Sequence, residues 1–224
     1  MKTEIIVVIY QRRKRLEHII NQFDKQTYKD FNLNIYNNTE RDLGINTSKA
    51  RLFHNKEKNN GAGDRFKIIP FLKGNPIIVL DDDEDITEDF VEYHIKEYEK
   101  WGDKCLLGWY SKTYKAGETD QRNEDKIYLP YGKEADVIGC GGMVVGRSLF
   151  DNVPELTDMK YPYIVNDMFT ISALARMNGY KLISIGSKCE IIYDGKDTTK
   201  RQIKERQEAF DLLRKRGWKF LSEL

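Results

Sequence analysis

Apolar and polar residues alternate along the first hundred positions in a way that predicts strand, helix and strand in turn. An apolar, β-branched run covers 4–10, and residues 31–36 alternate between apolar and polar. Between them lie four apolar residues at helical spacing: Leu16, Ile19, Ile20 and Phe23. The pattern predicts two strands joined by an amphipathic helix.

A second unit of the same kind follows. Residues 65–72 fit a helix, and 76–80 are wholly apolar, as in strands that a parallel sheet buries on both faces. Thr87 is expected to cap a further helix, because Glu88 and Asp89 occupy its first turn. The first half is therefore predicted to form a doubly wound α/β sheet with helices on both faces.

The second half is less regular. A polar loop is expected over 112–126, and a glycine-rich strand or turn over 138–145. A helix is predicted over 166–179, with Gly179 just after its end. Short strands are expected at 105–110, 181–185 and 190–193, and a last helix at 199–216 with Ile203, Phe210 and Leu213 facing inward.

These elements predict one domain over 1–224. Its parts would be a nucleotide-binding half (1–100), an acceptor-side half (101–198) and a C-terminal helix (199–224). The chain has 224 residues, enough for one substantial core, and a longer polypeptide that contains it is an alternative.

The composition limits which partners and which cellular location are expected. Lys and Arg (37) nearly balance Asp and Glu (36), which argues against nucleic acid as the main partner. The three cysteines are scattered without CxxC spacing, so neither a disulfide framework nor a zinc site is expected. The longest apolar runs are too short to span a membrane, and the expected location is the cytoplasm, without a signal peptide.

Three predicted strands end in polar residues that an open α/β sheet would bring to one edge. These ends are Tyr10-Gln11-Arg12, Asn37-Asn38-Thr39 and Asp81-Asp82-Asp83. Their convergence predicts a nucleotide pocket, with Asn37 or Asn38 near the base or ribose and the carboxylates near the phosphates.

The acidic run 81–85 indicates a divalent cation, because adjacent carboxylates beside a buried strand repel one another unless a cation compensates. Oxygen ligands suit Mg²⁺ or Mn²⁺, whose shell a substrate's phosphates often complete. A solvated acidic loop is the simpler alternative. A calcium-binding EF-hand is set aside, because Ile86 stands where that loop requires glycine.

The order of these motifs resembles that of a GT-A-fold glycosyltransferase, similar to the family 2 type and to small GT-A domains of large viruses. The resemblance spans about 4–185. It rests on the first strand, the turn 59–65, the segment 79–83, the segment 139–142 and Asn166-Asp167.

The resemblance implies roles for particular residues. Asp81 and Asp83 would be the metal ligands of an Asp-x-Asp motif, and Asp82 would touch the ribose or the sugar. Gly61, Gly63 and Arg65 would approach the nucleotide; an ordinary polar turn is the alternative for 59–65. Tyr10 and Arg12 are candidate nucleotide contacts because of their place at the end of the first strand, and a solvated helix start is the alternative for 12–15.

On the acceptor side, the resemblance implies that Asp167 is the catalytic carboxylate, kept ionised by a helix N-terminus. Helix capping is the alternative. Gly141 and Gly142 would bring backbone close to donor or acceptor sugar, unless they serve close strand packing.

Many family members place a metal-binding histidine after the catalytic helix, which this sequence lacks. Asp194 is the candidate ligand in that region, and Lys196 the candidate contact to the diphosphate. Trp109 and Tyr110 are candidates for stacking on a sugar or base, although aromatic residues at a strand end are often core.

The implied activity is metal-assisted transfer of a hexose from a UDP- or dTDP-sugar to a hydroxyl of a glycan or other acceptor, with inversion at the anomeric carbon. A retaining GT-A enzyme, a sugar-phosphate nucleotidyltransferase and a non-catalytic carbohydrate-binding module are the alternatives. If the chain is viral, the host cytoplasm is the expected compartment.

Overall fold

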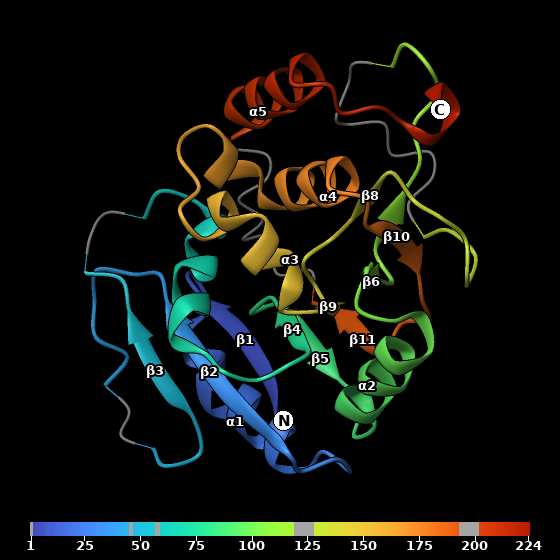
Figure 1. Ribbon diagram of the computed structural model, residues 1–224. Coiled ribbons are helices and arrows are strands. Elements are labelled where there is room, and N and C mark those ends of the chain that lie inside the picture. Colours follow the sequence, from blue (N-terminus) through green and yellow to red (C-terminus); the bar gives the residue numbers. More distant parts are fainter. Residues whose placement is uncertain (1, 45–46, 57–58, 119–127, 193–201) are drawn as a thin grey trace.

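A seven-stranded, mostly parallel sheet forms the centre of the molecule (Figure 1). A computed structural model describes residues 2–44, 47–56, 59–118, 128–192 and 202–224. Only β9 runs against its neighbours β4 and β6. In spatial order the strands are β10 (Lys181–Ser184), β6 (Cys105–Gly108), β9 (Met143–Val145), β4 (Ile77–Leu80), β1 (Thr3–Ile9), β2 (Phe31–Asn37) and β3 (Arg51–His54).

The central strands are buried because their residues are apolar on both faces. Every residue of β1 and β4 is buried, and the two strands pair in parallel with Ile5 opposite Ile78. Continuous apolar strands of this kind require cover on both faces of the sheet. The predicted doubly wound α/β fold is confirmed.

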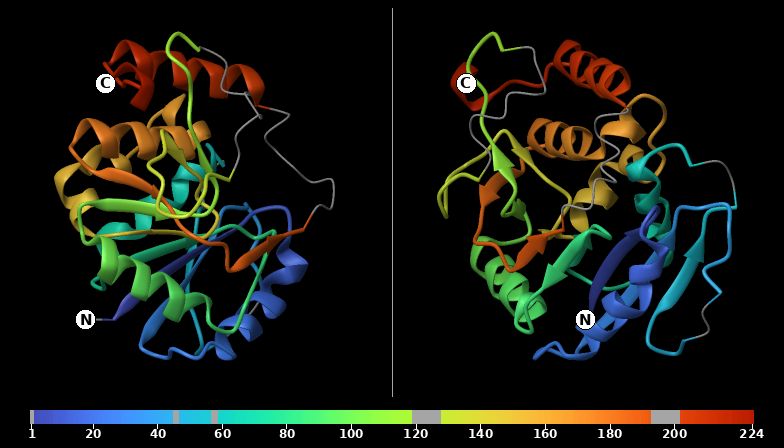
Figure 2. Two further views of the ribbon diagram at one scale, coloured as in Figure 1. Left: turned by 90° about the vertical axis from the view of Figure 1, so that its right-hand side faces the viewer. Right: turned by 180° about the vertical axis from the view of Figure 1, so that it is seen from behind.

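Helices cover the two faces of the sheet (Figure 2). On one face, α1 (Leu16–Asp24) and α2 (Phe90–Trp101) pack on β1 and β4, with the rings of Phe23 and Phe90 6.5 Å apart. On the other face lie η2 (Ala62–Phe71), α3 (Ser148–Asn152) and α4 (Asp167–Met177). Gly179 follows α4 with a φ of +80°, as the sequence predicts for a residue beyond the helix end.

A further helix, α5 (Ile203–Lys215), forms a third layer outside α4. Phe210 is fully buried, with its ring 5.3 Å from that of Phe169 in α4 and 5.5 Å from that of Trp218. Leu213 is buried beside it, but the expectation for Ile203 is wrong, because that side chain is 37% exposed. Ile203 is the first residue of the helix.

Short elements complete the fold and bring residues 81–85, the acidic segment, against the C-terminal half. Strand β5 (Glu84–Ile86) pairs antiparallel with β11 (Cys189–Ile191). Strand β7 (Ser111–Lys112) pairs with β8 (Val137–Ile138). The remaining short helices are η1 (Arg13–Arg15), η3 (Pro154–Thr157), η4 (Tyr163–Asn166) and η6 (Leu221–Glu223).

The structure differs from the expected elements in several places, and β5 and α3 are among the elements that were not expected. The helix expected at 65–72 is the 3-10 helix η2, which contains Pro70. Helix α2 begins at Phe90, with Asp89 at the capping position that was expected of Thr87. Strand β3 was not expected. In the described ranges no helix is long and apolar enough to cross a membrane.

Candidate active site

The site lies where β1, β2 and β4 end. These strands run in parallel, so the residues that follow them, Tyr10, Asn38 and Asp81, lie along one edge of the sheet. The structure therefore brings together the three polar strand ends that the sequence predicts to converge.

Asp82 fixes the loop after β1. Its carboxylate accepts hydrogen bonds from the backbone N–H of Tyr10 (2.9 Å) and of Arg12 (3.3 Å), and it pairs with the Arg12 guanidinium (3.1 Å). Asp82 and Arg12 are both buried. The predicted nucleotide-binding residues Arg12 and Asp82 thus contact each other, while the Tyr10 side chain stays 40% exposed at the same edge.

Arg65 connects the two carboxylates to which the sequence assigns different chemistry. Its Nη1 lies 2.6 Å from Oδ1 of Asp81, and its Nε lies 3.5 Å from Oδ2 of Asp167. The Nε also donates to the carbonyl oxygen of Ala62 at 3.0 Å. The guanidinium and the Asp167 side chain are almost completely buried, whereas the Asp81 side chain is 36% exposed, so only the pair with Asp167 is shielded from water.

Asp167 opens α4, and its Oδ1 accepts a hydrogen bond from the N–H of Met168 at 2.8 Å. Burial raises the pKa of the Asp167 carboxyl, and the Arg65 charge opposes that rise. An ionised carboxylate with a raised pKa has the properties of a general base.

The pKa values of the Asp83 and Glu84 carboxyl groups are both raised. Burial and the neighbouring Asp81 raise the pKa of Asp83 to about 6, although Arg12 lies 3.4 Å away. Burial holds the pKa of Glu84 well above its usual range, and its Oε2 accepts the N–H of Asp81 at 3.2 Å. The sequence did not distinguish Glu84 from the rest of the acidic run, because its burial depends on the pairing of β5 with β11.

This arrangement fits a divalent cation at Asp81 and Asp83. A cation would offset the repulsion that raises the Asp83 pKa, and Mg²⁺ or Mn²⁺ commonly takes one or two carboxylates and fills its shell with phosphate oxygens. Within the described ranges, no group of three or more His, Cys, Asp or Glu side chains is arranged to hold a metal by itself. Phosphate oxygens of a substrate would help to complete the shell, and Asp194, which lies outside the described residues, stays a candidate ligand.

The amides of Asn37 and Asn38 bind the protein itself. Asn37 donates to the carbonyl oxygen of Arg41 at 2.8 Å, and Asn38 donates to that of Gly61 at 3.0 Å. Asn38 also accepts a hydrogen bond from Asn55 at 2.9 Å. Both lie at the predicted edge, where they hold the neighbouring loops in place.

The turn before η2 packs against the segment that leads into α4. Gly61 has a φ of +147°, and a Cβ at this position would overlap the carbonyl oxygen of Ile164 in η4. Glycine is therefore required for this close approach. The contact places the turn that carries Arg65 directly against the segment that carries Asp167.

The glycine-rich segment packs equally closely on the acidic one. A Cβ on Gly141 would overlap the Glu84 carboxyl, and a Cβ on Gly142 would lie 2.9 Å from Sγ of Cys189 and 3.2 Å from Nε1 of Trp109. Gly142 has a φ of +65°. These glycines let the turn 139–142 lie against the acidic segment.

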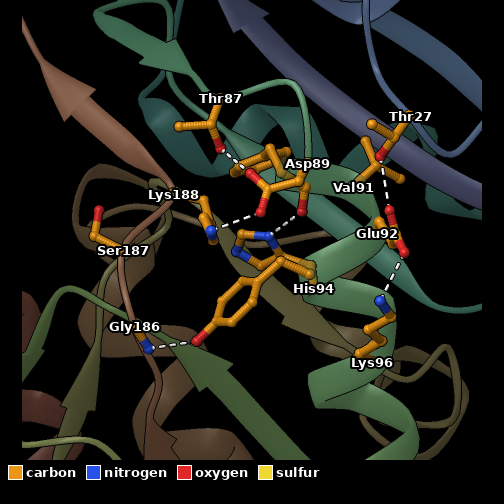
Figure 3. Close-up of polar contacts among 12 residues, drawn as sticks. Thr27, Thr87, Asp89, Val91, Glu92, His94, Lys96, Gly186, Ser187 and Lys188 are labelled. Carbon is orange, nitrogen blue, oxygen red and sulfur yellow. Dashed lines mark hydrogen bonds and ion pairs between the residues drawn. The ribbon is translucent and has the colours of Figure 1, made fainter.

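Helix α2 contacts the glycine-rich turn through His94, and Asp89, at its start, contacts the segment before β11 (Figure 3). The fully buried His94 places Nε2 3.0 Å from the carbonyl oxygen of Gly142 and Nδ1 2.7 Å from that of Phe90. Asp89 pairs with Lys188 at 2.6 Å, just before β11. Nothing in the sequence pattern singles out His94, because its partner is 48 residues away.

Two predicted site residues, Asp194 and Lys196, lie outside the residues that the structure describes. Their assignment to the metal and the diphosphate stays a prediction.

Several solved structures share this fold at low sequence identity. S. aureus TarS in complex with UDP-GlcNAc matches with a TM-score of 0.62 and 14% identity, over 88% of this chain and 60% of that one. Mannosyltransferase PcManGT from Pyrobaculum calidifontis, in complex with GDP-Man and Mn²⁺, matches with a TM-score of 0.64 and 13% identity, over 94% and 64%.

Another structure of TarS matches over 89% of this chain but only 38% of its own length. The chain thus spans less than two thirds of the proteins it resembles in structure. No curated protein matches the sequence of this chain.

The sequence itself identifies the family. Residues 4–151 match the family described as Glycosyl transferase family 2, and this range contains β1, the η2 turn, the acidic segment and the glycine-rich turn. The match covers more than half of the 224 residues, and the neighbours have the same fold. The chain belongs to glycosyl transferase family 2.

Proposed function

We propose that this chain transfers a hexose from a nucleoside diphosphate sugar to a hydroxyl of a glycan or other acceptor, with a divalent metal bound at Asp81 and Asp83. Membership of glycosyl transferase family 2 supports the reaction class. A UDP- or dTDP-linked donor is the form we favour.

One observation carries the proposal: Arg65 contacts both Asp81 and Asp167. A transferase must bring the donor's diphosphate and the acceptor hydroxyl to the same carbon. Side chains for these two tasks therefore have to meet, and the contacts of Arg65 join the proposed metal ligand to the proposed base.

Structural neighbours support a nucleotide-sugar donor. One TarS structure holds UDP-GlcNAc, and the mannosyltransferase structure holds GDP-Man with Mn²⁺. We infer that the donor lies along the ends of β1, β2 and β4, so that residues 1–100 bind the nucleotide and 101–198 form the acceptor side. Tyr10, Asn38 and Gly61 would line the nucleotide pocket, and Asp194 and Lys196 would lie near the diphosphate.

In the proposed reaction the acceptor oxygen attacks the anomeric carbon of the hexose. Asp167 takes the proton of that hydroxyl, and the bond between the anomeric carbon and the diphosphate oxygen breaks. A bound divalent metal would supply charge to stabilise the departing nucleoside diphosphate. Attack from the face opposite the leaving group inverts the anomeric configuration.

Burial and the Arg65 charge both act on the carboxyl of Asp167. Its burial raises the pKa of the carboxyl, which strengthens it as a base, and Arg65 keeps the carboxylate charged before the acceptor arrives. In a retaining enzyme the same carboxylate would instead stabilise positive charge. The anomeric configuration of the product separates the two mechanisms.

Calorimetric titration of UDP, dTDP and GDP into the protein, with Mn²⁺ and then with EDTA, tests the proposal. We expect one of them to bind more tightly with Mn²⁺, and Asp83→Asn to remove that difference. Asp85→Asn is the matched control, because Asp85 belongs to the same acidic run but pairs with Arg15 at 2.7 Å. If no nucleoside diphosphate binds to the folded protein, the proposal is wrong.

A further inference from the structure

Three aromatic rings form a cluster after β6 that the nucleotide site does not use. The rings of Trp109 and Tyr128 are parallel, with centroids 5.2 Å apart. Tyr110 stands edge-on to both, at 6.3 Å from Trp109 and 5.8 Å from Tyr128. The Tyr128 side chain is 49% exposed.

The backbone at Tyr128 has an unfavourable conformation. Its φ is +73°, a region in which a bulky residue other than glycine is strained. Hydrogen bonds hold it there: the N–H of Tyr128 donates to the Ser111 carbonyl at 2.9 Å, and the Ser184 hydroxyl donates to the Leu129 carbonyl at 2.8 Å. Strain that the surroundings enforce is typical of functional positions.

The cluster lies beside the glycine-rich turn. A Cβ on Gly142 would lie 3.2 Å from Nε1 of Trp109, and Gly139 packs against the ring of Tyr110. The other side of the same turn meets Glu84, within the acidic segment. A molecule resting on the rings would therefore lie beside the turn that contacts Glu84 in the acidic run.

The cluster is also separated from the nucleotide edge. Trp109 follows β6, and β9 lies between β6 and β4 in the sheet. The strands whose ends form the nucleotide pocket are β4, β1 and β2. A nucleoside base bound at that edge would thus be on the far side of the glycine-rich turn from Trp109.

We propose that Trp109 and Tyr128 form a binding site for a sugar ring of the acceptor. A pyranose presents C–H bonds on its faces, and these pack well on the electron-rich face of an aromatic ring. The role of this sugar as acceptor rests on the proposed function, whereas its binding does not. The acceptor would then be a carbohydrate, and the glycine-rich turn would separate it from the donor nucleotide.

NMR on the ¹⁵N-labelled full chain tests this proposal, because three tryptophans give three indole N–H signals and Trp109→Phe assigns one of them. The probes are the methyl glycosides of glucose, galactose, mannose and N-acetylglucosamine. We expect at least one of them to move the Trp109 signal. Tyr128→Asn, which tolerates the positive φ, should weaken that glycoside about fivefold, and Tyr128→Phe should bind as the wild type does.

Tyr131→Asn is the control, since Tyr131 is equally exposed (48%) but lies outside the cluster and bonds to Glu97. The proposal is overturned if no glycoside moves the Trp109 signal, or if Tyr128→Asn binds the glycoside as the wild type does. Loss of glycoside binding with intact nucleoside diphosphate binding overturns this inference alone. Glycoside binding without nucleoside diphosphate binding overturns the transferase proposal and leaves a sugar site.

Discussion

Arg65 lies between two carboxylates that the proposed reaction uses for different purposes. It pairs with Asp81, the proposed metal ligand, and with Asp167, the proposed base. In addition to burial, the charge of Asp81 raises the pKa values of Asp83 and Glu84, so a metal ion at Asp81 would reduce this repulsion when the donor is bound. Arg65 thus links the donor and acceptor sides of the site.

Asp167→Asn tests the role of the proposed base. The amide keeps the shape of the side chain but cannot take a proton, so kcat should fall by about 100- to 10,000-fold. Nucleoside diphosphate affinity should stay close to that of the wild type. Asp158→Asn serves as control, because Asp158 is exposed and pairs with Lys160. Unchanged turnover in Asp167→Asn would contradict the assignment.

The buried His94 leads to a prediction about how the stability of the protein depends on pH. Burial lowers its pKa below the usual 6.5, so the unfolded chain takes up a proton at a higher pH than the folded protein does. The stabilising effect of neutral His94 is therefore complete above about pH 6.5 and is lost as the pH falls below it, with a slope of up to about 1.4 kcal/mol per pH unit.

Urea denaturation of His94→Gln and of the wild type between pH 7.5 and 5.5 measures this slope. Between pH 7.5 and 5.5, the unfolding free energy of the variant should decrease less than that of the wild type. His54→Gln is the control, because His54 is exposed on β3. Parallel pH curves for His94→Gln and the wild type would show that His94 does not cause the dependence.

At the scale of elements, close backbone contacts through glycine position the site. Gly61 brings the η2 turn against η4, and Gly141 and Gly142 bring the turn 139–142 against the acidic segment. Such contacts join elements that are far apart in the sequence, so the site depends on their packing as much as on its own side chains.

Gly61→Ala should destabilise the fold more than a change at a glycine with a positive φ and open surroundings. Gly102 is the matched case, with a φ of +84°, a ψ of 175° and no atom within 4 Å of where an alanine Cβ would lie, so Gly102→Ala should cost about 1–3 kcal/mol. The clash with Ile164 should add about 1–3 kcal/mol in Gly61→Ala. Equal unfolding free energies for the two variants would contradict this account.

Helix α5 should matter to stability through its aromatic contacts with α4. Phe210→Ala should lower the free energy of unfolding by about 3–5 kcal/mol, because the side chain is fully buried among Phe169, Trp218 and Phe220. Ile203→Ala, on the exposed first turn, should change it by about 0.5 kcal/mol. Thermal or urea denaturation of both variants provides the measurement, and equal effects would contradict the packing described.

Elements with a strong apolar pattern were predictable from the sequence, and elements held by tertiary contacts were not. Strands β1 and β4 follow from unbroken apolar runs, whereas β3 has mostly exposed side chains and owes its conformation to pairing with β2. The position of the site at the strand ends was predictable too. The internal hydrogen bonds of Asn38 and the burial of Glu84 were not, because they depend on loops folding back from distant positions.

At the scale of the whole molecule, the proposed donor and acceptor sites lie at the ends of different strands of the sheet. The ends of β1, β2 and β4 form the proposed nucleotide side, and Trp109, which follows β6, belongs to the proposed acceptor side. Helix α5 covers α4, whose first residue is Asp167, and Asn166 donates to the Arg206 carbonyl at 3.0 Å. The third layer thus packs against the helix that holds the proposed base.

Release of nucleoside diphosphate from UDP-, dTDP- and GDP-hexoses, with Mn²⁺ or with EDTA, tests the central claim most directly. The account predicts release from one donor class, dependent on the metal, and loss of that release in Asp83→Asn but not in Asp85→Asn. Release that continues unchanged in EDTA and in Asp83→Asn, or no release from any donor by a protein that also binds none of them, would contradict it.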